Sequence, residues 1–183
     1  EITASASQSL DLKSILTDVL QKDFKTLEFE AGLVTIFNQK RGLLERAVRL
    51  GLPGEMPADP AEGLDGSPCD YVFRTGEILA IQDMRQGAPM DVSSIVEQGF
   101  FGYLGISLQL RGATIGTLCV FRKNTEPIPE NSIVLARSIG NQIGFAIENA
   151  RLFEEMRVSQ EALARSEADL RALFASMQDV VMV

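Results

Sequence analysis

Residues 102–122 carry the pattern that most restricts how this chain can fold. Over residues 103–110, large apolar side chains alternate strictly with other residues, which predicts a half-buried β-strand. Arg111 and Gly112 interrupt the pattern, and residues 114–121 resume it with apolar and β-branched side chains. We expect the two runs to pair antiparallel across a tight turn in which Gly112 adopts a positive φ. Because an isolated hairpin is marginal in water, the rest of the chain must cover its apolar faces.

The sequence before this hairpin predicts a helix followed by two strands. Residues 1–8 are small and polar and indicate an upstream linker. Apolar residues at helical spacing then predict a first helix, from a cap at Ser9 or Asp11 to about Phe24. Two short apolar runs, joined by a polar turn, predict a second hairpin with strands at 31–37 and 43–50.

A second helix is predicted after the loop of residues 51–70, which is rich in proline and glycine. Ser67 is suited to cap this helix, Pro68 suits its first position, and Gly76 is suited to end it after Thr75. A brief strand at 78–81 follows. The long segment 82–99 then contains a short helix between Asp91 and Gln98, and segments of this length often serve as lids or binding loops.

The last element is predicted to be a helix from Glu130 to about Ser176. Its roughly 47 residues would span about 70 Å, far beyond one domain. Its second half repeats apolar or small residues at alternating spacings of three and four, which predicts a parallel coiled-coil dimer. This seam comprises Phe145, Asn149, Leu152, Met156, Ser159, Leu163, Ser166, Leu170, Leu173 and Met177. The alternative is an amphipathic helix that lies on its own domain.

Two glycines interrupt the first half of this helix. Gly140 and Gly144 are four residues apart, and each costs about 1 kcal/mol relative to alanine inside a helix. Close approach to a partner would compensate for this cost. The partner is either the sheet or the twin helix of a dimer.

Composition excludes several classes of function. A net charge of −8 argues against binding to nucleic acid or to anionic membranes. The chain contains no histidine, which removes the commonest metal ligand and general base, so neither a metal site nor catalysis is expected. Neither a membrane span of roughly 18 apolar residues nor a secretion signal is present. We therefore expect a cytoplasmic protein whose two cysteines are reduced.

The order of these elements resembles the GAF domain family over about residues 9–152. Residues 67–83, with Ser67-Pro68-Cys69 and Ile81-Gln82-Asp83, are similar to the middle helix and third strand of that family. Residues 103–106 and 115–120 resemble its central hairpin, and residues 146–152 its exit helix. The resemblance implies an α/β (α+β) fold with an antiparallel central sheet between helices.

The tail resembles a linker helix that runs into a truncated PAS domain. The resemblance implies an upstream linker at 1–8, a GAF domain at 9–150, a coiled-coil helix at 151–176 and a PAS start at 177–183. This arrangement is found in bacterial sensor histidine kinases of two-component systems and in cyclic-di-GMP enzymes. We expect a non-catalytic homodimeric module that relays small-ligand or conformational signals to PAS and output domains. The alternatives are a ligand-free dimerisation module and a thiol-based redox sensor that uses Cys69.

The resemblance also implies a pocket between the sheet and the segment 68–100. Its candidate lining is Cys69, Tyr71, Phe73, Asp83, Met84, Phe100, Phe101 and Tyr103, which suits a small apolar or aromatic ligand. The alternative is a pocket closed by its own side chains. Some relatives attach a bilin through a Cys-His pair or bind cyclic nucleotides through an Asn-Lys and Asp-Glu signature, and neither pattern is present here. The absence of histidine also excludes a histidine-ligated haem, and the cofactor is otherwise unknown.

Cys69 has two interpretations. In the first turn of a helix, backbone N–H groups and the helix dipole favour a reactive thiolate. However, Cys69, Val72 and Phe73 share one helix face, so Cys69 also reads as a core residue. Cys119, within the second strand of the hairpin, reads most simply as core.

Overall fold

The structure is a computed structural model that describes residues 13–14, 16–18, 20–21, 29–53 and 64–181, with side chains as far as Arg171. The described residues between 13 and 21 are helical, and the remainder of the predicted first helix, with its cap, lies outside the described part. The chain divides into a compact unit that ends at Ile147 and a second unit from Glu148 to Val183. We describe each unit by itself.

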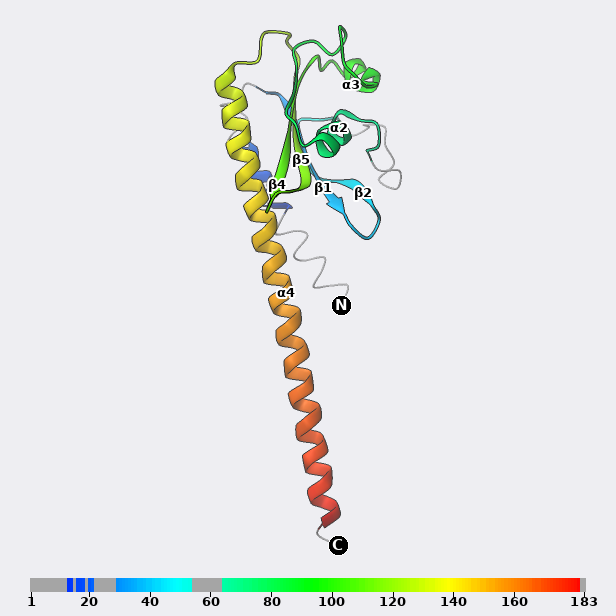
Figure 1. Ribbon diagram of the computed structural model, residues 1–183, viewed down its shortest axis with the longest axis vertical. Helices are drawn as coiled ribbons and strands as arrows, with labels where there is room; N and C mark the ends of the chain where they lie inside the picture. Colours follow the sequence, from blue (N-terminus) through cyan, green and yellow to red (C-terminus); the bar gives the residue numbers. More distant parts are fainter. Residues whose placement is uncertain (1–12, 15, 19, 22–28, 54–63, 182–183) are drawn as a thin grey trace. The chain divides into compact units, whose positions relative to one another are not determined.

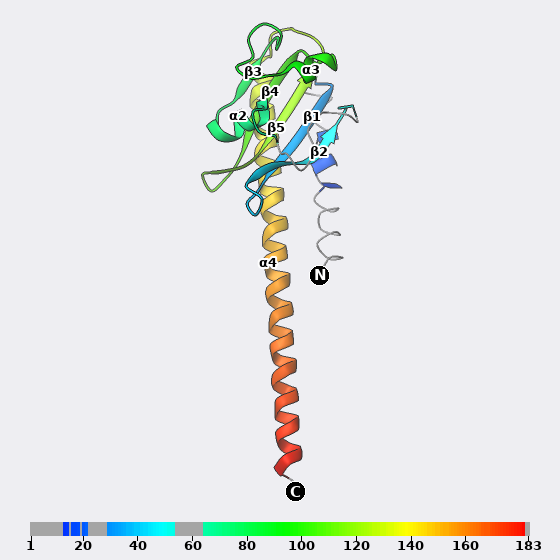
Figure 2. The ribbon, with the colours of Figure 1, turned by 90° about the vertical axis from the view of Figure 1, so that its right-hand side faces the viewer.

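A five-stranded antiparallel sheet forms the centre of the first unit, in the order β2-β1-β5-β4-β3. The strands are β1 (Ala31–Asn38), β2 (Leu43–Leu50), β3 (Leu79–Ile81), β4 (Gly102–Leu110) and β5 (Ala113–Arg122). The helices α2 (Pro68–Thr75) and α3 (Ser93–Glu97) lie over one face, and the first part of α4 (Glu130–Val181) lies along the other (Figures 1 and 2). The predicted fold class is confirmed.

The β4–β5 hairpin follows the sequence prediction closely. Arg111 and Gly112 form its turn, with φ of 49° and 82°, and Leu110 pairs with Ala113. Left-handed conformations at both central positions match the right-handed twist of paired strands. The expectation of a half-buried strand was wrong for the first half of β4, because Tyr103 and Leu104, on opposite faces, are both fully buried. The α2 side of the sheet is covered as well as the α4 side.

The face toward α4 carries one hydrophobic core. Side chains such as Leu104, Ile106 and Val120 from the sheet pack with Ile139 and Ile143 of α4 and with Leu16 and Leu20 near the N-terminus. A methyl group on Gly140 would lie 3.5 Å from both Ile106 and Leu108, and one on Gly144 would lie 3.3 Å from the Gln109 carbonyl oxygen. Of the two partners left open for these glycines, the structure therefore selects the sheet.

The helix α2 begins and ends where its capping residues predict. The Ser67 hydroxyl accepts a hydrogen bond from the Asp70 backbone N–H at 3.2 Å, and Gly76 ends the helix with a φ of 69°. The Asp70 carboxylate accepts from the Gly66 N–H at 3.0 Å and pairs with Arg74 Nε at 2.8 Å. These contacts fix the first turn of α2, which carries Cys69.

The helix α4 is continuous from Glu130 to Val181. Residues 179–181, within the predicted PAS start at 177–183, continue the helix. The PAS start stays a prediction.

Candidate functional site

The predicted pocket residues divide into two groups of four. Cys69, Met84, Phe100 and Tyr103 are buried together in the core between α2, α3 and the sheet. Phe121 of β5 lies among them, with its ring centroid 5.4 Å from that of Tyr103 and 6.0 Å from that of Phe100. These four predicted residues therefore do lie together.

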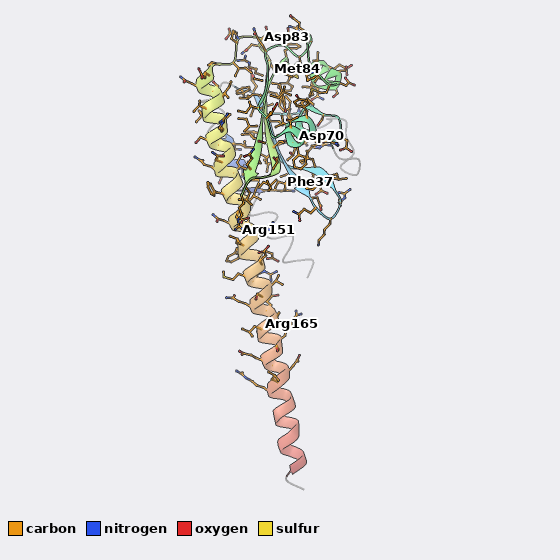
Figure 3. All side chains as sticks on the ribbon, viewed as in Figure 1. Phe37, Asp70, Asp83, Met84, Arg151 and Arg165 are labelled. Carbon is orange, nitrogen blue, oxygen red and sulfur yellow. The ribbon has the colours of Figure 1, made fainter. Side chains whose placement is uncertain are left out.

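The other four residues lie apart from this core. Tyr71 is 37% exposed, and Phe73 stacks on Phe37 with ring centroids 4.9 Å apart. Asp83 pairs with Arg85, whose guanidinium also lies 4.3 Å from the centre of the Phe101 ring. Figure 3 shows Asp83 and Met84 at the end of the sheet near α3 and Phe37 toward the opposite end. The eight predicted residues therefore do not line a single pocket in this structure.

The core under α2 is filled by its own side chains near Tyr103. A methyl group on Gly105 would overlap the Tyr103 hydroxyl and would lie 2.7 Å from Val72 Cγ2 of α2. The phenol thus occupies the space that a side chain on Gly105 would otherwise take. This packing corresponds to the closed alternative among the two considered for the pocket.

A chain of hydrogen bonds crosses this core. Thr35 Oγ1 and Thr117 Oγ1 are 2.7 Å apart, Thr117 Oγ1 lies 3.4 Å from Cys119 Sγ, and the Tyr103 hydroxyl donates to the same sulfur at 3.0 Å. All four residues are fully buried. The sequence analysis missed the two threonines. Their signal was a threonine in the middle of each of two largely apolar strands that neighbour one another in the sheet.

The two thiols differ in their electrostatic surroundings. A hydrogen bond to Cys119, together with burial, raises the pKa of the Cys69 thiol well above its usual value. Burial acts to raise the pKa of Cys119, but hydrogen bonds from Cys69, Thr117 and Tyr103 outweigh it and lower that pKa. The hydroxyl groups of Tyr103 and Thr117 lie against Cys119 rather than against Cys69, the cysteine to which the helix-dipole argument applies.

Asp83 lies in a polar setting at the edge strand β3. Its carboxylate accepts hydrogen bonds from Arg85 Nε, Arg85 Nη2 and Gln86 Nε2 at 2.8 to 3.0 Å. The Arg85 contacts hold the pKa of Asp83 at about 2. A hollow of about 460 Å³ adjoins it, lined by residues 79–83, Gln86, Gly87, Pro89 and Thr125. This carboxylate is already paired within its own segment.

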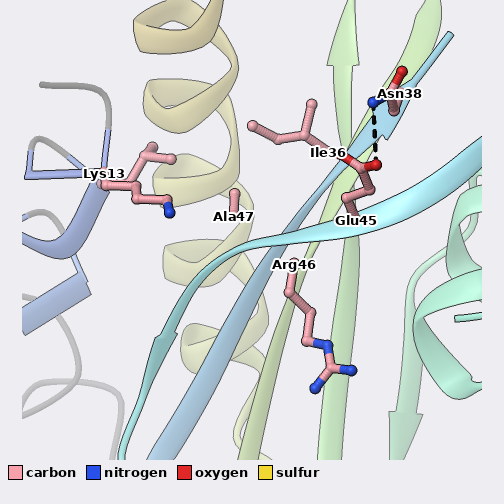
Figure 4. A pocket seen from close by; sticks show the side chains of 7 residues that line it. Lys13, Ile36, Asn38, Glu45, Arg46 and Ala47 are labelled. Carbon is pink, nitrogen blue, oxygen red and sulfur yellow. Dashed lines mark hydrogen bonds between the residues drawn. The ribbon is translucent and has the colours of Figure 1, made fainter. Parts of the chain in front are cut away.

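A second hollow, of about 410 Å³, lies between the N-terminal helical residues and the β1–β2 hairpin (Figure 4). It is lined by Lys13, Leu16, Ile36, Asn38, Glu45, Arg46 and Ala47. Asn38 Nδ2 donates to Glu45 Oε1 at 3.1 Å, and Arg41 pairs with the same carboxylate oxygen at 2.6 Å. Asn38 and Glu45 are thus engaged along the hairpin.

The seam of α4 is exposed wherever its side chains are described. Phe145, Leu152, Met156, Leu163 and Leu170 are between 46% and 68% exposed. Phe153 and Val158 are exposed apolar residues beside the seam. Soluble proteins expose single apolar residues commonly but long continuous rows of them rarely.

Among the described residues, no group of three or more cysteine, aspartate or glutamate side chains is placed to hold a metal ion. Within the same part of the chain, none of the helices combines the length and the apolar character needed to span a membrane.

Comparison with known proteins gives one family and a set of similar folds. The family model described as GAF domain matches residues 11–147. A domain attributed to a two-component sensor histidine kinase of Sinorhizobium meliloti 1021 is 17% identical, with a TM-score of 0.62, covering 79% of this chain and 95% of that one. A type II free methionine-R-sulfoxide reductase of Thermoplasma acidophilum is 11% identical, with a TM-score of 0.65 and coverages of 78% and 96%. GAF3 of Slr1393 from Synechocystis sp. PCC6803 is 18% identical, with a TM-score of 0.63 and coverages of 79% and 98%. At these identities the likeness concerns the fold.

Proposed function

Because the chain belongs to the GAF domain family, we propose that it passes conformational changes through a dimeric C-terminal helix to a downstream domain. GAF domains are regulatory sensor modules found in signalling proteins. We place the GAF domain at 9–150, the signalling helix at 151–176 and the start of a PAS domain at 177–183. The module itself is non-catalytic and cytoplasmic, and the output is a histidine kinase or a cyclic-di-GMP enzyme.

The exposed seam of α4 is the observation that carries this proposal. Its large side chains recur at spacings of three and four, as a coiled coil requires, and the described ones are open to water. Burying one Leu or Met side chain contributes about 1.5–3 kcal/mol relative to leaving it exposed. A second copy of the same helix supplies a seam of matching chemistry and length.

Ion pairs along the second unit stabilise the helix but leave its apolar side chains exposed. Arg151 pairs with Glu155, Arg157 with Glu154 and Glu161, and Arg171 with Glu167. Such pairs contribute roughly 0.3–0.5 kcal/mol each on an exposed helix. Because most helical stability in proteins comes from packing an apolar face, these pairs are a minor part of what a helix of this length needs.

The hairpin β4–β5 offers a route from the α2 side of the sheet to the helix. Tyr103 and Cys119 face α2, whereas their neighbours Leu104 and Val120 pack in the core that includes Ile139 of α4. A shift of either strand therefore changes the packing on both faces at once. A ligand or modification acts through this route only if it favours one packing over the other.

The filled core beside Tyr103 favours a conformational input over a ligand held there. A small ligand at the hollow beside Asp83 is the second candidate, supported by its polar lining and its position on the lid segment. Native mass spectrometry of freshly purified protein separates the two, since a co-purifying small molecule supports the ligand-sensing form. The simplest alternative is a ligand-free dimerisation module, which predicts the mass of the polypeptide alone.

Sedimentation analysis of Leu170→Asp tests the dimer. Val158→Asp is a matched control, because both positions are 51% exposed and only Leu170 lies on the seam. We expect the unmodified chain and Val158→Asp to sediment as dimers at micromolar concentration, and Leu170→Asp to shift toward the monomer. A monomeric unmodified chain, or equal weakening by both substitutions, would contradict the proposed seam.

A further inference from the structure

The two cysteines of this chain are distant in the sequence but lie in the same buried core. Cys69 lies in the first turn of α2 and Cys119 in the middle of β5, and both belong to the core beneath α2. Val72, one turn after Cys69, would contact a methyl group on Gly105 at 2.7 Å, and Gly105 pairs with Cys119 across the hairpin. The inner face of α2 therefore packs against the β4–β5 hairpin that carries the second sulfur, and both sulfurs lie in one buried core.

Two hydroxyl groups lie against Cys119 Sγ. The Tyr103 hydroxyl donates to this sulfur at 3.0 Å, and Thr117 Oγ1 lies 3.4 Å from it, where either atom can be the donor. The Thr117 backbone N–H donates to Thr35 Oγ1 at 3.2 Å, and the two threonine hydroxyls are 2.7 Å apart. A sulfur that accepts hydrogen bonds from neighbouring hydroxyls has surroundings that stabilise a thiolate.

We propose that Cys69 and Cys119 are a redox pair that a small hydroperoxide oxidises to an intramolecular disulfide between α2 and β5. Both sulfurs are buried, with Cys69 4% and Cys119 0% exposed, so bulky oxidants are excluded and a small one must enter by local opening. The reaction uses no metal and no group beyond the peroxide.

The chemistry balances in two steps. The Cys119 thiolate attacks the terminal peroxide oxygen, the O–O bond breaks, and the alcohol or water that leaves takes one proton, so that Cys119 becomes a sulfenic acid. The Cys69 sulfur then attacks the Cys119 sulfur, the S–O bond breaks, and water leaves with the Cys69 proton. Two thiols lose two electrons and two protons, and the peroxide is reduced by the same two electrons.

The bond would join elements on the two sides of the proposed relay. Cys119 faces α2, whereas the adjacent residues Leu118 and Val120 pack in the core with Ile143 of α4. Linking Cys69 to Cys119 therefore fixes α2 to the strand whose opposite face supports α4. The thiol chemistry itself does not depend on the dimer, so it is tested separately.

The full chain is treated with hydrogen peroxide, unfolded in the presence of an alkylating reagent and weighed intact without reductant. We expect loss of two hydrogens, loss of both alkylatable thiols, a Cys69–Cys119 linked peptide after proteolysis, and recovery of both thiols with dithiothreitol. Cys69→Ser and Cys119→Ser should each abolish the loss of two hydrogens. Two alkylatable thiols after treatment, or a disulfide between two chains, would overturn the proposal.

The variant Tyr103→Phe tests whether the Tyr103 hydroxyl contributes to the reaction or only lies near the sulfur of Cys119. Without the phenol donor, we expect disulfide formation to be several-fold slower at neutral pH and its pH profile to move to higher pH. Tyr71→Phe, at the other tyrosine of the chain, should oxidise like the unmodified protein. Identical rates and pH profiles for the two variants would overturn the assignment of Cys119 as the attacking sulfur.

Discussion

The Tyr103 hydroxyl occupies the space over Gly105, two residues along the same strand. The same oxygen donates to Cys119 Sγ, the residue paired with Gly105 on β5. One side chain thus fills the space over its own strand and orders the polar groups of its neighbour.

Gly105→Ala should destabilise the protein by about 1–3 kcal/mol, the usual cost of forcing extra volume into a packed core. The added methyl group would overlap the Tyr103 hydroxyl and would lie 2.7 Å from Val72 Cγ2. Urea unfolding at fixed protein concentration measures the change. Gly87→Ala is the control, because nothing lies within 4 Å of a methyl group there. Equal stability of Gly105→Ala and the unmodified chain would show that the space is open.

Tyr103→Phe should lower the free energy of unfolding by about 0.5–1.5 kcal/mol, because it removes one buried hydrogen bond and leaves the ring in place. In the Gly105→Ala background the same change should cost less or become favourable, since it also removes the overlapping oxygen. A double-mutant cycle by urea unfolding measures this coupling. Strict additivity would contradict the contact between the hydroxyl and position 105.

Gly140→Ala should stabilise the protein by about 1 kcal/mol through helix propensity. Its methyl group would make ordinary contacts at 3.5 Å with Ile106 and Leu108. Gly144→Ala should gain less, because its methyl group would lie 3.3 Å from a backbone carbonyl oxygen that cannot rotate away. Thermal unfolding of the two variants side by side checks the order. A loss of stability in Gly140→Ala would mean that α4 sits closer to the sheet than described.

Asp83 should make stability depend on pH in the acid range. Its folded pKa is about 2, below the value of about 3.9 for an unfolded aspartate, so the unfolded chain binds more protons between these values. The contribution is therefore complete above about pH 4 and is lost as the pH falls toward 2. The difference in unfolding free energy between the unmodified chain and Asp83→Asn should shrink over this range. A difference that stays constant from pH 5 to the acid limit would contradict the pairing with Arg85.

The sequence pattern was reliable where local rules decide the outcome. Ser67, Pro68 and Gly76 fixed the ends of α2, because capping and left-handed termini depend on neighbouring residues alone. The PAS start that the pattern indicates at 177–183 stays a prediction. The pattern was incomplete at the predicted pocket, since spacing along the chain does not state which of eight side chains turn toward one another.

By itself, the sequence determined the elements, their order and the exposed seam of α4, because periodicity and turn chemistry are properties of consecutive residues. Only the tertiary structure decided that Gly140 and Gly144 face the sheet and that Tyr103 closes the space beneath α2. It also decided that the hydroxyls of Thr117 and Tyr103 converge on Cys119 rather than on Cys69. The contacts of α4 with the sheet and of Tyr103 with Cys119 join separate elements, and their geometry is set by strand pairing and helix packing.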